Sequence, residues 1–335
     1  MMSSIPCITG PDFGERFSQR LPGGRFPLSG QWELTCRCNL RCVMCYTDCF
    51  NTLDKIQQEL SFPEILRIMD EIHEAGCLEL CLTGGEPLVR KDFGDIYAYA
   101  KQKGFLVTVF TNGTLLTEKI ADYWACSPPS MIEISFHGLT QRSFEQITQG
   151  AGSYERCLAG IRLILERNLP LTLKTTGMTV NRDEVLKIKE YVAGLGKDRP
   201  NKVQYKFGSD VRPRLDGSED VYQYQLLEND ITDIEQADPE FRAERFRQNG
   251  EAEARLREGA ILCAGGQYKF HIDAYGQLQL CSNNRRQSYD LRRGSFQEGF
   301  YRFLPLFPCP NKALAPELIR IDTAQNGKAQ VAVQD

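Results

Sequence analysis

Residues 31–45 read Gln-Trp-Glu-Leu-Thr-Cys-Arg-Cys-Asn-Leu-Arg-Cys-Val-Met-Cys and join a predicted strand to a group of three cysteines. Polar and apolar side chains alternate over 31–35, as in a β-strand with one covered face. Cys38, Cys42 and Cys45 follow at spacings of four and three residues. Three close thiolates can hold three irons of a cubane cluster and leave the fourth iron open. A structural zinc completed by Cys36 or Cys49 and a buried helix face are the alternatives.

Strand and helix patterns alternate outward from this stretch. The helix after the first strand has Ser61 as N-cap, Glu64 three residues later in a capping box, and Gly76 at its end. Strands separated by helices form a parallel sheet through right-handed crossovers. The six predicted strands are Gln31–Thr35, Leu78–Thr83, Phe105–Thr111, Met131–Phe136, Leu171–Thr176 and Lys202–Phe207.

Most of these strands alternate in polarity, whereas parallel strands covered on both faces are apolar throughout. Glu33, Glu133 and Lys174 lie on the polar face, and Trp32 and Leu173 lie on the apolar one. Because a closed eight-stranded barrel fills its interior with apolar side chains, we expect an α/β fold with a partial (β/α)6 TIM-type barrel. Its lumen would hold a polar ligand. An antiparallel sheet with one solvated face is the alternative.

The composition narrows the class of protein. The chain has 335 residues, 41% hydrophobic and 25% charged, with a net charge of −4, which is typical of a soluble globular protein. Residues 1–6 do not resemble a secretory signal, and no apolar run is long enough to span a membrane. We therefore expect a cytoplasmic protein with no membrane or nucleic-acid partner. Thirteen cysteines against three histidines favour a sulfur-ligated metal centre.

A second motif follows the second predicted strand, where residues 83–88 read Thr-Gly-Gly-Glu-Pro-Leu. Glycines allow the backbone to approach a ligand closely. Ligands of parallel α/β folds bind at the carboxyl ends of the strands, where the three-cysteine loop also lies. The two motifs together therefore predict one site at that end of the barrel.

With these motifs the sequence resembles the radical S-adenosylmethionine (SAM) superfamily over about residues 28–310. Further matching segments are Thr111-Asn112-Gly113, Ile134-Ser135-Phe136-His137-Gly138 and Pro213-Arg214-Leu215-Asp216-Gly217. The resemblance implies a [4Fe–4S] cluster on Cys38, Cys42 and Cys45, with SAM on the open iron. It also implies that one electron, from an external donor similar to flavodoxin or ferredoxin, cleaves SAM to a 5'-deoxyadenosyl radical. The residues that it implies for SAM binding are Gly84, Gly85, Glu86, Pro87, Asn112 and Ser135.

Two residues depart from the family pattern. Met44 replaces the aromatic residue common before the third cysteine and can pack beside the adenine. His137 replaces an aspartate and has either a substrate-side acid–base role or a structural one.

Arg37 and Arg41 flank the cysteines and either favour the reduced cluster or are solvated surface charges. No catalytic acid or base is assigned, although strand order places Asp210, Lys206 and His137 near the barrel mouth.

The C-terminal third contains a second cysteine group. Cys263, Gly276 and Cys281, with Cys309 downstream, resemble the opening of a SPASM or twitch extension, of the shorter twitch type with one auxiliary cluster. The fourth ligand is unassigned, and zinc is the alternative. His271 alternates with apolar positions beside Lys269, so we expect a solvated side chain. The predicted divisions are an N-terminal extension (1–29), the barrel (30–211), a charged helical connector (212–260), the auxiliary-cluster domain (261–311) and a tail (312–335).

These features predict a radical SAM enzyme that abstracts a hydrogen from a peptide substrate during peptide maturation. Twitch and SPASM extensions are common among peptide maturases, and this assignment rests on that analogy. The segment before the first strand is too short for a folded precursor-binding domain, so a separate recognition protein is a possible partner. The alternatives are a radical SAM dehydrogenase or epimerase of a small molecule such as an aminosugar, and a non-catalytic metal-stapled binding module.

Overall fold

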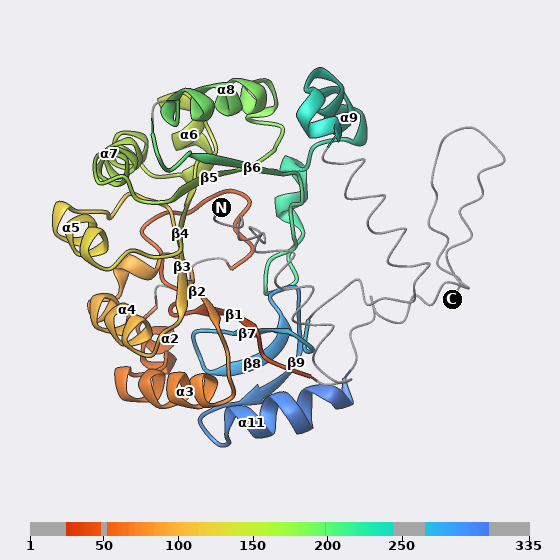
Figure 1. Cartoon of the computed structure of the whole chain (residues 1–335). Helices are drawn as coiled ribbons and strands as arrows, with labels where there is room; N and C mark the ends of the chain where they lie inside the picture. Colours follow the sequence, from red (N-terminus) through yellow and green to blue (C-terminus); the bar gives the residue numbers. More distant parts are fainter. Residues whose placement is uncertain (1–24, 48–51, 198, 244–264, 308–335) are drawn as a thin grey trace, which may run out of the picture.

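The computed structural model describes residues 25–47, 52–197, 199–243 and 265–307. Within these residues one nine-stranded sheet has the order β6-β5-β4-β3-β2-β1-β7-β8-β9 (Figure 1). The strands are β1 Ser29–Glu33, β2 Glu79–Thr83, β3 Leu106–Thr111, β4 Met131–Ser135, β5 Leu171–Thr176, β6 Gln204–Gly208, β7 Lys269–Ile272, β8 Gln277–Cys281 and β9 Asn284–Asp290. The helices are α2 Leu53–Gln58, α3 Phe62–Glu74, α4 Phe93–Gln102, α5 Glu118–Cys126, α6 Gln141–Thr148, α7 Ser153–Glu166, α8 Val185–Leu195, α9 Glu228–Ala237 and α11 Phe296–Glu298.

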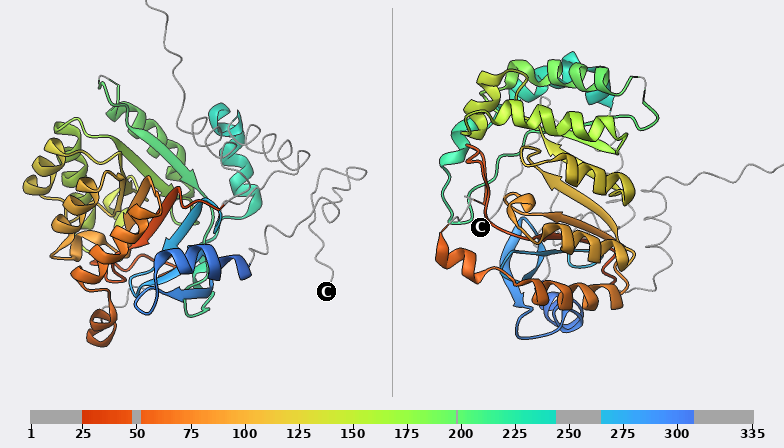
Figure 2. Two further views of the ribbon diagram at one scale, coloured as in Figure 1. Left: turned by 60° about the horizontal axis from the view of Figure 1, so that its bottom comes forward. Right: turned by 90° about the vertical axis from the view of Figure 1, so that its left-hand side faces the viewer.

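Strands β1 to β6 pair in parallel in their order along the chain. The sheet they form is curved, and helices α3 to α8 cover its outer side (Figures 1 and 2). This arrangement is a partial barrel of the TIM type, which confirms the predicted fold. Because all six strands run the same way, their carboxyl ends meet at one rim.

Helix α3 shows why the sequence forms this helical layer. Its capping box joins Ser61 to Glu64, as predicted, and its buried residues include Ile65 and Met69. The chain turns after the helix at Gly76, whose φ of +87° favours glycine. The helix thus has a stable first turn, one apolar stripe against the sheet, and a defined end.

The two faces of the strands differ as the alternation predicts. Trp32, Leu80, Ile134 and Leu173 are buried in the core that the helices cover. Lys174, at an alternate position on the concave face, is half-buried. The polar face therefore lines the inside of the partial barrel.

The C-terminal segment continues the same sheet. Strand β7 pairs in parallel with β1, and β8 and β9 follow as antiparallel strands. Phe270, Phe296 and Phe300 pack together and belong to the same apolar core as the barrel. The hairpin of β8 and β9 lies beyond β7 in the sheet, and α11 contacts α3 (Figure 2). Within the predicted helical connector (212–260), the structure has helix α9, and residues 244–260 lie outside the described residues.

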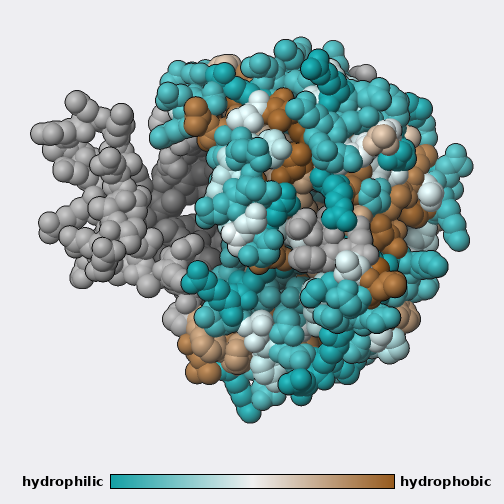
Figure 3. Space-filling view, turned by 180° about the vertical axis from the view of Figure 1, so that it is seen from behind, coloured by the Kyte–Doolittle hydropathy of each residue, from teal (hydrophilic) through white to brown (hydrophobic). Residues whose placement is uncertain are grey.

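The described surface is mostly hydrophilic, with separate small apolar patches on the face in Figure 3. Among the described helices, none combines the length and the apolar character that crossing a bilayer requires.

Candidate functional site

The three cysteines lie in an irregular loop after β1, so the helix-face alternative is wrong. Arg41 N donates to Thr148 O at 3.0 Å and Val43 N donates to Ile147 O at 2.9 Å, which fixes the loop along the end of α6. Cys45 N donates to Cys42 O at 3.0 Å. The backbone of this cluster loop, residues 36–47, is therefore held by its neighbours as well as by itself.

The side chains of Cys38, Cys42 and Cys45 are partly exposed and form no disulfide with one another. Leu40 N lies 3.4 Å and Asn112 Nδ2 3.7 Å from the Sγ of Cys38, as donors to it. Such N–H groups stabilise cluster sulfurs and tune the potential of an iron–sulfur cluster. Accessible thiols in a fixed loop, with donors already facing a sulfur, fit the ligand set of a [4Fe–4S] cluster.

A structural zinc, the alternative to a cluster, would require a fourth ligand and side chains that converge on a single ion. Burial raises the pKa of the Cys36 thiol to about 12, and Glu33 adds to the effect. Cys49 lies outside the described residues. In the described part of the chain no three Cys, His, Asp or Glu side chains converge on one point, as ligands of a single ion do. In a cubane each cysteine binds its own iron, so its thiols need not converge.

The glycine loop after β2 lies directly against the cluster loop. Gly85 N donates to Thr35 O and Glu86 N donates to Arg37 O, both at 2.8 Å. A Cβ at Gly85 would lie 2.4 Å from Arg37 O, and Gly84 has a φ of +148°. These glycines are needed because two backbones approach each other. The predicted contact of Gly84 and Gly85 with SAM stays a prediction, and the sequence did not indicate this backbone contact.

The side chain of Glu86 connects the glycine loop to the loop after β3. Its carboxylate is buried and accepts hydrogen bonds from Thr111 Oγ1 at 2.8 Å, Asn112 N at 2.7 Å and Leu88 N at 3.1 Å. Burial raises the pKa of Glu86 to about 7, against the opposing effect of these donors. Both oxygens thus have protein partners, and Glu86 connects the loops after β2 and β3. Its contact with SAM stays a prediction.

The other predicted SAM residues lie on the same rim. Asn112 Nδ2 donates to Asn39 Oδ1 at 2.9 Å, so Asn112 joins the loop after β3 to the cluster loop. Pro87 is buried directly after Glu86. Ser135 ends β4 and is half-buried on the polar face. The structure therefore places Cys38, Gly85, Glu86 and Asn112 in one connected set of loops, with Ser135 on an adjacent strand.

His137 has a structural position. Its Nδ1 accepts a hydrogen bond from Thr176 N at 3.1 Å, and Asn181 Nδ2 donates to its carbonyl oxygen at 2.7 Å. Burial, helped by the charge of Lys174, lowers the pKa of His137 to about 4. A neutral imidazole that accepts a backbone hydrogen bond favours the structural alternative.

Two further residues of the cluster loop have partners that the sequence did not indicate. Arg37 pairs with Glu59, with Nη2 to Oε2 at 3.0 Å, and is not a solvated surface charge. Glu59 also accepts a hydrogen bond from Thr35 Oγ1 at 2.5 Å. Met44 packs against the cluster of Ile147, Met178, Val211 and Val221. Arg41 is exposed.

Of the predicted auxiliary-cluster ligands, Cys281 lies half-buried at the end of β8. Cys263 and Cys309 lie outside the described residues. The prediction for His271 was wrong, because this side chain is fully buried and its Nδ1 lies 2.9 Å from Gln279 Oε1. The reason is that β7 pairs with β1, so its polar face meets the inside of the barrel. There Nε2 of His271 lies 3.4 Å from Glu33 Oε1.

Two carboxylates on the concave face hold cations, and sequence reasoning did not identify either group. Glu33 accepts two hydrogen bonds from Arg285, at 2.9 and 2.5 Å, and lies near His271. Glu133 contacts Lys206 Nζ at 2.6 Å and Lys174 Nζ at 3.5 Å. The alternation placed Glu33, Glu133, Lys174 and Lys206 on one face, which was the available signal. It does not determine which of them pair.

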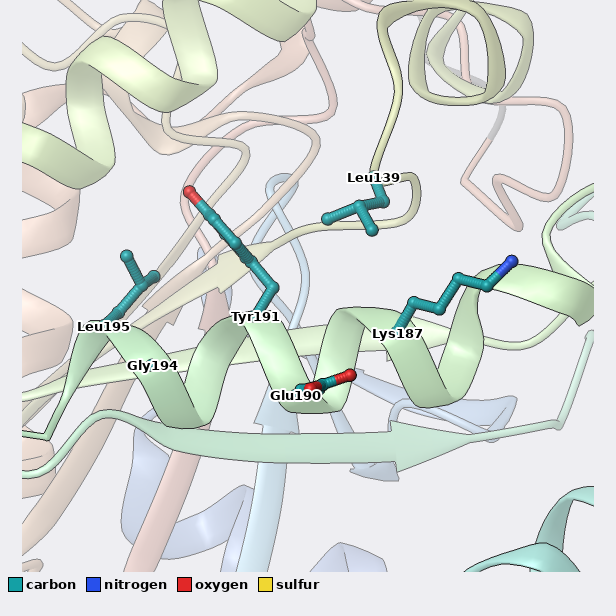
Figure 4. A pocket seen from close by; sticks show the side chains of 6 residues that line it. All are labelled: Leu139, Lys187, Glu190, Tyr191, Gly194 and Leu195. Carbon is teal, nitrogen blue, oxygen red and sulfur yellow. The ribbon is translucent and has the colours of Figure 1, made fainter.

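A separate hollow of about 510 Å³ lies in the outer helical layer (Figure 4). Five of its lining residues come from α8, namely Lys187, Glu190, Tyr191, Gly194 and Leu195, and Leu139 faces them from the loop after β4. None of the predicted site residues lines it.

Comparison with known proteins identifies the domain. Residues 32–192 match the model of the family described as "Radical SAM superfamily". This chain carries a radical SAM domain. An AdoMet-dependent heme synthase from Methanosarcina barkeri is 34% identical over 165 residues, which are 49% of this chain and 47% of the relative. A PqqA peptide cyclase from Granulibacter bethesdensis is 34% identical over 175 residues, which are 52% and 46%. The chain thus spans about half the length of these relatives.

Solved structures agree with the radical SAM fold. SuiB from Streptococcus suis, bound to the precursor peptide SuiA, has a TM-score of 0.62 at 13% identity, over 90% of this chain and 72% of that one. The protein anSMEcpe with bound AdoMet has a TM-score of 0.61 at 16% identity, over 81% and 79%. Radical SAM domains use a [4Fe–4S] cluster and SAM. The domain accounts for the three-cysteine loop and the glycine loop as parts of one site.

Proposed function

We propose that this chain is a radical SAM enzyme whose cluster is held by Cys38, Cys42 and Cys45 and whose substrate is a peptide. The observation that carries the proposal is the contact between the cluster loop and the glycine loop. Backbone hydrogen bonds from Gly85 and Glu86 to Thr35 and Arg37 make this contact at the rim of the barrel. The Asn112 side chain adds a link from the loop after β3 to the cluster loop. A reduced [4Fe–4S] cluster bound there supplies the electron that cleaves SAM and yields a hydrogen-abstracting radical.

The residues of the chain have distinct tasks in this proposal. Cys38, Cys42 and Cys45 would hold the [4Fe–4S] cluster through their thiolates. Asn112 holds the sulfur of Cys38 by its N–H group and keeps the loops after β1 and β3 together. Glu86 holds the loops after β2 and β3 together through its hydrogen bonds with Thr111 and Asn112. Ser135, on the concave face, would donate a hydrogen bond to SAM.

A peptide substrate has support from the comparisons. The relatives include proteins named PqqA peptide cyclase, and SuiB was solved with its precursor peptide bound. A second candidate, a porphyrin substrate, has support from the relatives named AdoMet-dependent heme synthase. Either substrate would require the same cleavage of SAM, so the first experiment tests the SAM chemistry itself.

The test uses protein purified without oxygen, with iron content and 5'-deoxyadenosine as the measured quantities. Dithionite and SAM should give 5'-deoxyadenosine from the wild type. Cys42→Ala should lower its formation more than about 100-fold, because the cluster loses one of its three protein ligands. Cys126→Ala is the matched control, since Cys126 is an exposed thiol on α5. Unchanged SAM cleavage in Cys42→Ala would disprove the cluster assignment.

The same preparation tests the auxiliary cluster, which we propose on Cys263, Cys281 and Cys309. Two [4Fe–4S] clusters contain about eight irons per chain, and one contains about four. We expect Cys42→Ala to retain the auxiliary iron and Cys281→Ala to retain the SAM-responsive iron. A wild-type protein with about four irons would remove the auxiliary cluster from the proposal.

The substrate class requires its own assay. Peptides encoded near this gene, and separately an iron-free or iron-loaded coproporphyrin, are incubated with enzyme, SAM and reductant. Mass spectrometry of the peptide or porphyrin then shows which is altered. Modification of a porphyrin with no change in any peptide would replace the peptide proposal by the second candidate.

A further inference from the structure

The residue directly after the third cysteine is tied to a buried carboxylate of the first strand. Tyr46 Oη donates a hydrogen bond to Glu33 Oε1 at 3.0 Å. Two backbone contacts hold the same segment, because Arg214 Nη1 donates to Cys45 O and Leu215 N donates to Tyr46 O, both at 2.9 Å. The end of the cluster loop is thus anchored by the Tyr46 side chain on Glu33 and by its backbone on residues 214–215.

Glu33 is in turn held by the C-terminal hairpin. Arg285, on β9, donates to both oxygens of Glu33 at 2.9 and 2.5 Å. Its guanidinium lies over the ring of Tyr46, with 5.4 Å from Cζ to the centroid. Arg285 Nε also donates to Ser282 O at 2.9 Å, in the turn that directly follows Cys281. One arginine therefore joins the turn after Cys281 to the residue after Cys45.

These three residues, Glu33, Tyr46 and Arg285, form what we call the Glu33 clamp. Glu33 is fully buried and the Arg285 side chain is 13% exposed, so the pair has left water almost completely. A buried ion pair is often no more stabilising than apolar residues of the same volume, because desolvation offsets the attraction. Its bidentate geometry instead fixes the relative position of the two groups. We therefore expect the clamp to fix the relative positions of its residues more than it stabilises the fold.

We propose that the Glu33 clamp lets the C-terminal hairpin position Cys45, so that the hairpin controls the geometry of the SAM-binding cluster. Glu33, Tyr46 and Arg285 are positioning residues and do not touch SAM or substrate. The proposal rests on the proposed cluster site at Cys38, Cys42 and Cys45. It assigns the hairpin a role toward this first cluster that does not depend on an auxiliary cluster.

The experiment compares Arg285→Lys with the matched variant Arg292→Lys. Arg292 belongs to the segment after β9, where it pairs with Glu64 of α3 at 3.0 Å and not with Glu33. Lysine keeps the positive charge beside Glu33 but cannot form the bidentate contact. Each full-length protein is reconstituted without oxygen and reduced with dithionite. Its electron paramagnetic resonance spectrum is then recorded with and without SAM.

We expect Arg285→Lys to lose at least half of the SAM-responsive cluster signal or to shift its g values, while Arg292→Lys keeps the wild-type spectrum. The double variant E33Q/R285Q separates positioning from folding, because it leaves no uncompensated buried charge. It should unfold at a temperature close to that of Arg292→Lys and still show the altered signal.

Wild-type spectra in both Arg285→Lys and the double variant would overturn the clamp while leaving the proposed function intact. An equal change in Arg292→Lys would overturn it too, because the effect would then belong to the hairpin's general stability. A wild-type protein with no SAM-responsive cluster would remove the proposed function and the clamp together.

Discussion

The two sides of the partial barrel each hold a buried carboxylate between two basic side chains, but they differ in how far water reaches these basic side chains. At β1, Glu33 is fully buried, and Arg285 and His271 are 13% and 0% exposed. At β4, Glu133 is 4% exposed, but Lys174 and Lys206 are 45% and 53% exposed. The first group is sealed by the C-terminal hairpin, and the second faces the open side of the barrel.

Because of this difference in exposure, the two carboxylate groups can have different roles. A sealed ion pair has one geometry and contributes to position. Half-exposed lysines can be rehydrated, exchange partners and reach a ligand. Ser135, Lys174 and Lys206 pair across β4, β5 and β6 in one row on the concave face, which places these lysines beside a predicted SAM residue.

The sealed side should respond most strongly to loss of its carboxylate. Glu33→Gln leaves Arg285 as a buried cation without its counter-charge, and breaking a buried pair in this way costs about 3–5 kcal/mol. Glu133→Gln leaves lysines that water can solvate, so we expect a loss of about 1 kcal/mol or less. Urea unfolding of the two metal-free proteins measures both values. Equal losses would show that the two sides do not differ.

Lowering the pH should reduce the contribution of the Glu33 carboxylate to the free energy of unfolding. Burial alone would raise the pKa of Glu33, but His271 and Arg285 hold it well below its usual value of 4.5. A depressed carboxyl pKa stabilises the fold above the unfolded-state value, and this stability is lost as the pH falls below it. The difference in unfolding free energy between wild type and Glu33→Gln should therefore shrink steadily from pH 5 to pH 3. A constant difference would contradict the ion pair.

Glu86 sharpens the comparison because it is buried with hydrogen-bond donors and without a cation. Its pKa is raised from 4.5 to about 7 by burial, so its carboxyl destabilises the fold as it ionises. The raised value means that stability is present below pH 4.5 and is lost between about pH 4.5 and 7. Relative to Glu86→Gln, the wild type should lose about 3 kcal/mol over that window.

Urea unfolding of wild type and Glu86→Gln, without metal, at pH 5, 6, 7 and 8 tests this sign. Subtracting the two curves cancels titrating groups that the proteins share. A difference that grows in favour of the wild type as the pH rises would show that the donors from Thr111, Asn112 and Leu88 outweigh burial. Glu86 would then resemble Glu33.

The sequence predicted the local features well, because local spacing determines them. The alternation of polar and apolar residues located all six strands of the barrel, and the capping box at Ser61 located α3. The spacing of Cys38, Cys42 and Cys45, beside a strand end, placed them in a rim loop. Each of these features depends on residues close together in the chain.

The features that were missed depend on residues far apart in the sequence. His271 was expected in solvent because its own strand shows only alternation, whereas its burial follows from the pairing of β7 with β1. Glu33 and Arg285 are 252 residues apart, and no local pattern joins them. The contact of the glycine loop with the backbone of Thr35 and Arg37 was also not predicted, because those residues are about 50 positions away in the sequence.

The smallest effect is expected at the open side. Lys206→Met removes one of two lysines on Glu133, and the remaining Lys174 lies 3.5 Å from it. Exposed ion pairs contribute about 0–1 kcal/mol, so the free energy of unfolding should change by no more than about 1 kcal/mol. Lys206→Arg, which keeps the charge, is the matched control and should equal the wild type. A loss of about 3 kcal/mol in Lys206→Met would mean that Glu133 depends on this lysine as Glu33 depends on Arg285, and the distinction between a sealed side and an open side would fail.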